Sequence, residues 1–288
     1  MTGRPARTVA AVLAAAWLAL ASAPAAAQNL NLGGGEGGPI EIFADDGIEW
    51  QQDNRIFVAQ GNARAVRDDV EVHADTLKAY YREVGGKSEI WRLDASGQVR
   101  ILSTGETAYG DLAVFDVDQS VLVLTGRAVR FVTAEDEIRA DRQLEYWTGK
   151  RLAVARGNAV AKREGKTLRA QVLAAYMQPT KSGGTEITRV EAFDDVRIVT
   201  ERDDVTADRG VYNLRTGMAT LTGAVKLKRG GNVLNGCRAD VNLNTGISRL
   251  RGCDGKGRGR VSGTLRPEAA RPGESGGDGD NDQDDKKK

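Results

Sequence analysis

A short phrase recurs along this chain at intervals of roughly 30 residues, and it constrains the fold more than any other sequence feature. Each copy begins at a position that is usually glycine. An aspartate, or another residue at the same point of the repeat, follows later in the copy. The copies are Gly61 with Asp75, Gly97 with Asp111, Gly126 with Asp141, Gly157 with Gln171, Asp195 with Asp208, and Gly223 with Cys237. Such a period is typical of repeat architectures, in which one unit cannot bury its apolar face alone. Function is therefore expected on an extended surface shared by many units.

Between these phrases, apolar residues alternate with polar residues, as in Val70-Glu71-Val72 and Val225-Lys226-Leu227. Alternation of this kind favours half-buried strands. Turn sequences such as Gly85-Gly86-Lys87 and Arg229-Gly230-Gly231 separate the strands at regular spacing. We therefore predict an all-β array of roughly 16 to 20 strands.

The N-terminus has the features of a secretory signal peptide. Arg4 and Arg7 precede an apolar run, Val9–Leu20, and Ala25-Ala26-Ala27 offers a cleavage site of small residues. An uncleaved membrane anchor would need about 20 apolar residues, which is more than this run supplies. We predict that residues 1–27 are a cleaved signal peptide.

Composition divides the rest of the chain into three parts. Residues 28–38 hold five glycines and little apolar content, so we expect a flexible leader. Residues 39–265 form the predicted β-array, and residues 266–288 predict a disordered tail of Gly, Asp and Lys. The alternating acids of the tail resemble a calcium loop, but Gln283 stands where that loop requires glycine.

Net charge and cysteine content limit the kinds of partner and of binding site expected for this chain. Removal of Arg4 and Arg7 changes the formal net charge from +1 to −1, which argues against a nucleic-acid partner. Cys237 and Cys253 follow glycines in successive units of an exported chain, where disulfides persist. We predict a bridge between adjacent rungs; a metal site is the alternative, disfavoured because the single histidine, His73, is far away in sequence.

No set of residues predicts catalysis. A glycosidase would need acids that converge from different strands, whereas most paired acids here lie at turn positions that favour Asp. Asp75, Asp141 and Asp208 recur once per unit, so we expect them to set corners. We therefore predict no catalytic residue, no metal, no cofactor and no enzymatic activity. The basic segment 249–260 is interpreted as a solvated hairpin. The alternative is a functional segment that binds an anionic partner such as a glycolipid headgroup.

Five segments carry a resemblance to a known family. They are Pro39–Asp45, Phe57–Ala63, Val72–Leu77, Val121–Gly126 and Ile138–Asp141. In this order and spacing the chain resembles the OstA/LptA family of periplasmic lipopolysaccharide-transport proteins. It departs from a minimal member in its further repeats, its cysteine pair and its acidic tail.

The resemblance implies an antiparallel β-jellyroll that is open at both ends and folded like a taco. Its interior would shield the acyl chains of lipopolysaccharide, in the lipid A part, while the protein stays in the periplasm. Members stack end to end, or onto jellyrolls of an inner-membrane partner (LptC-like) and an outer-membrane partner (LptD-like). The chain would thus form part of a bridge between the two membranes.

By position, the resemblance also places nine residues in the lipid groove. Because a slip of one residue turns a strand over, the face of each stays open. The predicted groove residues are Ile40, Ile42, Phe57, Val70, Val72, Leu77, Val121, Val123 and Tyr146.

Two other functions remain as alternatives to a lipid carrier. One is an envelope adaptor that polymerises through its edge strands and binds no lipid. The other is a polysaccharide-active β-helix enzyme, which would have parallel strand ladders and converging acids. Strand direction separates the enzyme from the two antiparallel alternatives.

Overall fold

Eighteen strands and no helix make up the part of the chain that the computed structural model describes, residues 39–103, 105–179, 185–253 and 259–266. Every strand pairing is antiparallel, which confirms the predicted all-β fold and excludes the parallel ladders of a β-helix. The strands are β1 Glu41–Phe43, β2 Gly47–Gln51, β3 Ile56–Arg67, β4 Val70–Val84, β5 Lys87–Ser103, β6 Glu106–Asp116, β7 Val121–Thr125, β8 Val129–Val132, β9 Asp136–Ala140, β10 Gln143–Trp147, β11 Leu152–Arg163, β12 Lys166–Pro179, β13 Thr185–Val199, β14 Asp203–Asn213, β15 Met218–Arg229, β16 Asn232–Asn242, β17 Ser248–Arg251 and β18 Ser262–Thr264.

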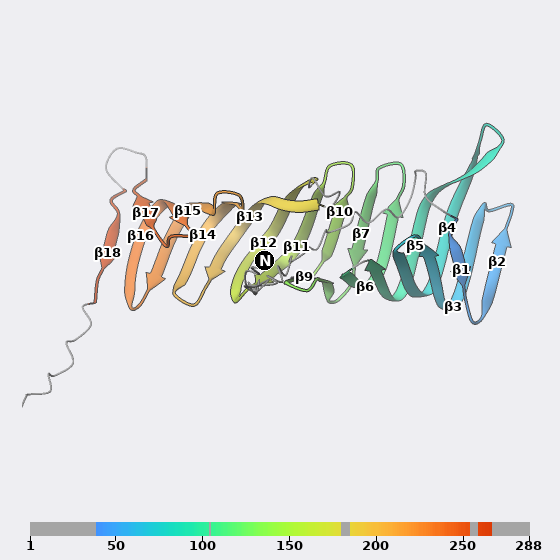
Figure 1. Cartoon of the computed structure of the whole chain (residues 1–288), viewed down its shortest axis with the longest axis horizontal. Coiled ribbons are helices and arrows are strands. Elements are labelled where there is room, and N and C mark those ends of the chain that lie inside the picture. Colours follow the sequence, from blue (N-terminus) through green and yellow to red (C-terminus); the bar gives the residue numbers. More distant parts are fainter. Residues whose placement is uncertain (1–38, 104, 180–184, 254–258, 267–288) are drawn as a thin grey trace, which may run out of the picture.

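The strands follow one another along an elongated array, so the two ends of the described chain lie at its opposite ends (Figure 1). At four places a pair of short strands stands where one long strand would otherwise be. β1 and β2 both pair with β3, β7 and β8 both pair with β6, β9 and β10 both pair with β11, and β17 and β18 both pair with β16. The break between the two short strands of each pair lies opposite the bend in the neighbouring long strand.

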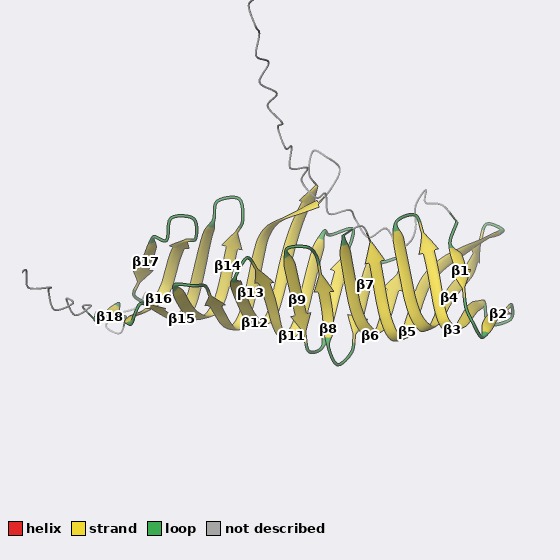
Figure 2. Cartoon of the chain, turned by 60° about the horizontal axis from the view of Figure 1, so that its bottom comes forward, coloured by secondary structure: helices red, strands yellow, loops and turns green. Residues whose placement is uncertain are grey.

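These short strands define two walls that meet along a corner. Wall 1 comprises β2, β7, β10 and β17 with the halves of the long strands on the same side of the bend. Wall 2 comprises β1, β8, β9 and β18 with the other halves. Every long strand therefore runs through both walls, as Figure 2 shows from the side.

The repeated phrase of the sequence forms the corner. Gly97 and Gln98 in β5 together face the single residue Asp111 in β6, a β-bulge that bends the strand. Both bulge residues have left-handed backbones, with φ of 81° for Gly97 and 46° for Gln98. A Cβ on Gly97 would overlap the Asp75 carboxylate of β4, so the position requires glycine.

Side chains along the corner tie neighbouring strands together. Asn62 Nδ2 donates a 2.8 Å hydrogen bond to Asp45 Oδ2, and Asn158 Nδ2 does the same to Asp141 Oδ2. The backbone N–H of Ala224 donates to Asp208 Oδ2 at 3.2 Å. The structure therefore gives the repeated aspartates a structural role, as the sequence predicts.

Alanine, glycine or valine lines the inner side of the corner in each long strand and in β8 and β9, which lets the two walls converge. Most are buried, as in Ala63 and Ala159, both with 0% exposure. The set is Ala63, Ala74, Val99, Gly110, Val129, Ala140, Ala159, Ala170, Val196, Ala207, Val225 and Gly236. From here the core extends as two clusters, and Leu144 packs against both.

A disulfide takes the place of the corner hydrogen bonds at the C-terminal end. Cys237 occupies the corner position of β16 and is bonded to Cys253, with a Cα–Cα distance of 4.9 Å. Cys253 lies after β17, and its N–H donates to the Gly259 carbonyl, 3.1 Å away. The bridge thus fastens the last rung to β16.

The predicted signal peptide, leader and tail lie outside the described residues, apart from Arg266 at the start of the tail. No helix among the residues of the array is long and apolar enough to cross a membrane.

Gly97→Ala should lower the free energy of unfolding by about 1 to 3 kcal/mol, because alanine would be strained at this φ and would displace Asp75. Gly149→Ala is the control, since Gly149 has open space around its Cα and no left-handed φ. Urea unfolding followed by circular dichroism measures both; equal losses would contradict a conformational role for Gly97.

Candidate lipid-facing groove

Two uninterrupted rows of apolar residues face the inside of the array, one on each wall. On wall 2, cross-strand pairing links Ile42, Ala65, Val72, Ile101, Ala108, Phe131, Ile138, Ala161, Leu168, Ile198, Val205, Leu227, Leu234 and Gly263. On wall 1 it links Trp50, Phe57, Ala79, Leu93, Phe115, Leu122, Tyr146, Ala153, Ala175, Val190, Tyr212, Ala219 and Val241. Pairing continues the wall 1 row from Val241 to the polar Ser248 of β17, so the apolar part of this row ends at β16. Neither row contains a charged residue in the described strands.

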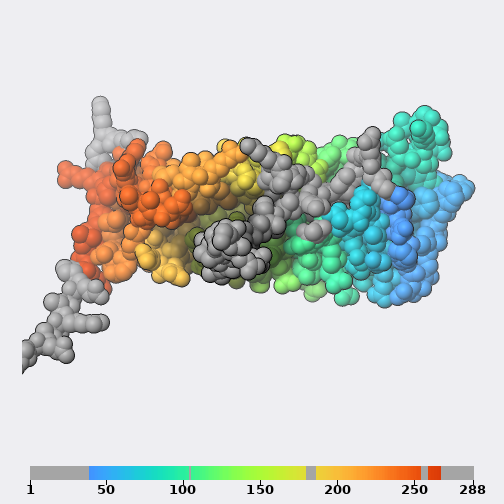
Figure 3. All heavy atoms as spheres, viewed as in Figure 1, coloured from blue at the N-terminus to red at the C-terminus, as the bar shows by residue number. Residues whose placement is uncertain are grey.

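The inner face is dry beside the corner and unevenly exposed further out. Val99 and Val196, beside the corner, are each 1% exposed. Within the two rows, Ile101 and Leu122 are each 3% exposed, whereas Phe131 and Leu168 are partly buried. The inner face therefore has accessible apolar surface at some positions of each row. Figure 3 shows the elongated molecule in space-filling form, with the N-terminal strands at one end and the C-terminal strands at the other.

Charged side chains end the inner face of wall 2. Glu106, Asp136 and Asp203 lie on the inner face two residues further from the corner than the apolar row. Arg229 holds Asp203 through two hydrogen bonds of 2.5 and 2.9 Å. The inner face is thus apolar within and charged at its margin.

Glu106 lies close to the opposite wall near the middle of the array. Burial raises the pKa of Glu106, and burial together with the Glu106 carboxylate raises the pKa of Tyr146, which lies on wall 1. Burial also raises the pKa of Asp136, against the opposing effect of Arg163. The Glu106 carboxylate of wall 2 is therefore near enough to the Tyr146 hydroxyl of wall 1 for its charge to act on it across the interior.

Most of the predicted groove residues lie on the inner face. Phe57, Val72 and Tyr146 belong to the two apolar rows. Leu77 lies on the same face of β4 as the row residue Ala79, two residues nearer the corner, and pairs with Ala59 and Ala95. Ile42 begins the wall 2 row. Contact of these side chains with lipid stays a prediction.

Two further predicted residues extend this set towards its margins. Val70 is buried on the same face as Val72. Ile40 precedes β1 and is partly buried.

Val121 and Val123 lie on the outer face of wall 1. Val123 pairs with Val114 and Glu145, while Leu122 and Leu124 occupy the inner positions of β7. The run Val121–Thr125 is apolar at four consecutive positions, so alternation could not identify its inner face. Phe131, Ile138, Leu168 and their neighbours were missed, although they recur at fixed offsets from the corner residues.

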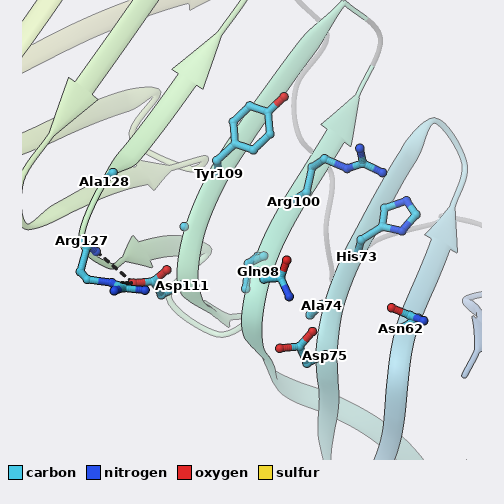
Figure 4. Close-up of a pocket in the computed structure, with 12 residues that line it drawn as sticks. Asn62, His73, Ala74, Asp75, Gln98, Arg100, Tyr109, Asp111, Arg127 and Ala128 are labelled. Carbon is cyan, nitrogen blue, oxygen red and sulfur yellow. Dashed lines mark hydrogen bonds and ion pairs between the residues drawn. The ribbon is translucent and has the colours of Figure 1, made fainter. Parts of the chain in front are cut away.

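A depression of about 760 Å³ lies on the outer surface at the corner, between β3 and β8 (Figure 4). Its lining mixes small apolar residues with polar side chains, which include His73, Arg100 and Asp111. Arg127 caps Asp111 through its backbone N–H, 3.0 Å from Oδ2. His73 Nε2 lies 2.5 Å from Glu71 Oε1, and the Arg64 hydrogen bond holds the pKa of Glu71 below its usual range. In the described ranges, no three His, Cys, Asp or Glu residues are grouped so as to hold a metal ion.

Residues 41–148 and 137–247 each match the family described as LptA/(LptD N-terminal domain) LPS transport protein. The chain belongs to this family of lipopolysaccharide transport proteins. The two matches together span the array from β1 to the turn before β17.

Two individual proteins are also similar to the chain. An uncharacterised protein of Rhizobium meliloti (strain 1021) is 28% identical over 125 residues, which are 42% of this chain and 67% of that protein. The crystal structure of LptH from Pseudomonas aeruginosa, described as the LptA homologous periplasmic component of the lipopolysaccharide transport device, aligns over 80% of this chain and 96% of its own. That alignment has 11% identity and a TM-score of 0.21.

Glu106→Gln should raise the melting temperature at neutral pH, because the wild-type protein must keep a carboxylate partly desolvated there. The folded state binds this proton more tightly than the unfolded chain does, so the advantage of glutamine shrinks as pH falls through the raised pKa. Thermal unfolding between about pH 7 and pH 4.5 measures the difference. Glu201→Gln, at an exposed turn, is the control, and a lower melting temperature for Glu106→Gln at neutral pH would contradict the assignment.

Proposed function

We propose that this chain is a non-enzymatic periplasmic carrier whose inner face shields the acyl chains of lipopolysaccharide on their way from the inner to the outer membrane. The proposal rests on the two apolar rows, which cross the array from β1 to β18 on wall 2 and from β2 to β16 on wall 1, in a member of a lipopolysaccharide transport family. Burial of an acyl chain gains about 0.8 kcal/mol per methylene, so a carrier in water needs an apolar surface of this kind.

The repeat suits transfer as well as binding. Each rung offers similar small and branched apolar side chains, so a lipid would have comparable affinity at successive positions and no deep trap along the way. The charged margin of wall 2 keeps polar groups at the outer limit of the apolar face, where a glycolipid headgroup would remain in water.

Exposed apolar side chains at both ends support association of jellyrolls end to end. Phe43, Ile48 and Trp50 lie on β1 and β2 with exposures of 48%, 53% and 57%. Ile247, Val261 and Leu265 lie at the other end, with exposures of 59%, 43% and 71%. Edge strands with free backbone groups can be extended by another chain.

Strand direction favours the same association. The chain runs from wall 2 to wall 1 through β1 and β2, and from wall 1 to wall 2 through β17 and β18. The C-terminal edge of one copy can thus pair antiparallel with the N-terminal edge of the next, wall against matching wall. The same edges would accept related jellyrolls of membrane partners, LptC-like and LptD-like.

A photoreactive phenylalanine analogue at Phe131 should crosslink to lipopolysaccharide in cells, because Phe131 lies on the accessible part of the inner row. The same analogue at Val132, the next residue, is the control, since it points to the outer face. Gel shift of the adduct measures capture. Equal capture at both positions, or capture at neither, would count against an inner lipid path, and absence at both would favour the adaptor without lipid.

Ile48→Lys should weaken self-association about tenfold or more, because it places a charge where an apolar side chain of the edge would be buried. Leu112→Lys is the matched control, since Leu112 is 49% exposed but lies on β6 in the middle of the array. Sedimentation velocity over a concentration series measures both variants. Equal weakening would mean that copies associate through their sides.

A further inference from the structure

The outer face of wall 2 carries a basic row without a single acidic residue. Cross-strand pairing places one residue from each successive strand on this row, which spans nearly the whole array. The row comprises Phe43, Arg64, His73, Arg100, Tyr109, Arg130, Arg139, Val160, Arg169, Arg197, Thr206, Lys226, Asn235 and Ser262.

Several cations of the basic row face one another directly. Arg130 is paired with Arg139, and Arg169 is paired with Arg197. Like charges directly opposite on adjacent strands are destabilising, and a bound anion would remove this cost. The basic row is therefore an arrangement that folding alone does not favour.

Neighbouring acids neutralise only part of the basic row. Arg139 pairs with Glu137, and Arg197 binds Asp204 through two hydrogen bonds of 2.9 Å. Arg100, Arg169 and Lys226 are exposed, and none has a carboxylate within ion-pair distance among the described residues.

The outer face of wall 1 differs in this respect. The acids of its equivalent row have arginine partners at four strands. These pairs are Asp94 with Arg92, Glu145 with Arg156, Glu191 with Arg189, and Asp240 with Arg238. Unpaired positive charge thus lies along the basic row of wall 2.

The chain itself supplies a complementary segment. Residues 274–285 contain six acidic residues and no Lys or Arg. They follow β18, which belongs to wall 2 and contributes Ser262 to the basic row. The backbone N–H of Arg266 donates a 2.8 Å hydrogen bond to Asn232 Oδ1, so the chain leaves the array beside this same wall.

The length of chain beyond Arg266 is sufficient for the acidic segment to reach these cations. Strands are about 4.8 Å apart, so Lys226 on β15 lies roughly 10 Å from β18, and Arg169 on β12 lies roughly 24 Å away. The eight residues from Arg266 to Glu274 span up to roughly 27 Å.

We propose that the acidic segment 274–285 binds across the basic row of its own chain, at Lys226, Arg197 and Arg169. A single segment can follow a row that turns with the twist of the sheet, whereas a flat membrane surface meets only part of it. The bound segment keeps these cations from other polyanions. The inner face and its lipid path are on the opposite side of the wall, so this binding is separate from lipid carriage.

A photoreactive phenylalanine analogue at Gln283 of the full-length mature chain tests the proposal, with crosslinked peptides identified by mass spectrometry. We expect crosslinks within the same chain, concentrated on the outer face of β12 to β15. The yield should fall about fivefold in Arg169→Gln/Arg197→Gln, and also at about 1 M salt, where the Debye length is about 3 Å. Arg209→Gln is the matched control, an exposed arginine on the outer face of wall 1, and should leave the yield unchanged.

Retention on a heparin column gives an independent measurement on the full chain. Neutralising the segment with Asp278→Asn, Asp280→Asn, Asp282→Asn and Asp284→Asn should raise the salt needed for elution, and adding Arg169→Gln/Arg197→Gln should reverse the rise. Crosslinks that are scattered, that join two chains, or that resist Arg169→Gln/Arg197→Gln would overturn the proposal. Unchanged heparin retention after neutralisation would overturn it as well, since the basic row would then be uncovered already.

Discussion

The corner bulge is the constraint on which the rest of this structure depends. Two residues must oppose one across neighbouring strands, and the backbone must turn left-handed at that point, as at Gly97 and Gln98. Because the bend recurs at the same level in every long strand, a sheet that would otherwise be flat becomes two walls. Inner residues beside it, such as Ala63 and Ala159, have to be small, since the walls are closest there.

The corner also explains how much could be predicted from the sequence. In β4, the inner residues lie three and one positions before Asp75 and two and four positions after it: Val72, Ala74, Leu77 and Ala79. The same offsets hold around Asp111, Gln171, Asp208 and Cys237. The repeat was therefore sufficient to predict an all-β array with structural aspartates and a disulfide between rungs. Residues at these offsets also make up most of the inner face.

Other features could not be predicted because they depend on pairing between strands. The resemblance places Val121 and Val123 in the groove by position and leaves the face of each open, and only the register puts Leu122 inside and Val123 beside Glu145. The basic row is invisible in the sequence for the same reason, since Arg130 and Arg139 become neighbours only when β8 and β9 pair. A one-residue slip would exchange the two faces, so composition cannot decide between them.

Rows that run across strands also impose a requirement at the ends of the array. An apolar face that carries lipid past one molecule is useful only if it continues into the next, and continuation needs matching walls and opposite strand directions. The first and last rungs meet both conditions, because β2 and β17 belong to wall 1 and the chain traverses the two rungs in opposite directions. The disulfide at Cys237 and Cys253 holds the last rung against β16 at the corner, on a side where the described part of the chain contributes no further strand. The covalent bond thus keeps in place an edge that internal strands maintain by pairing on both sides.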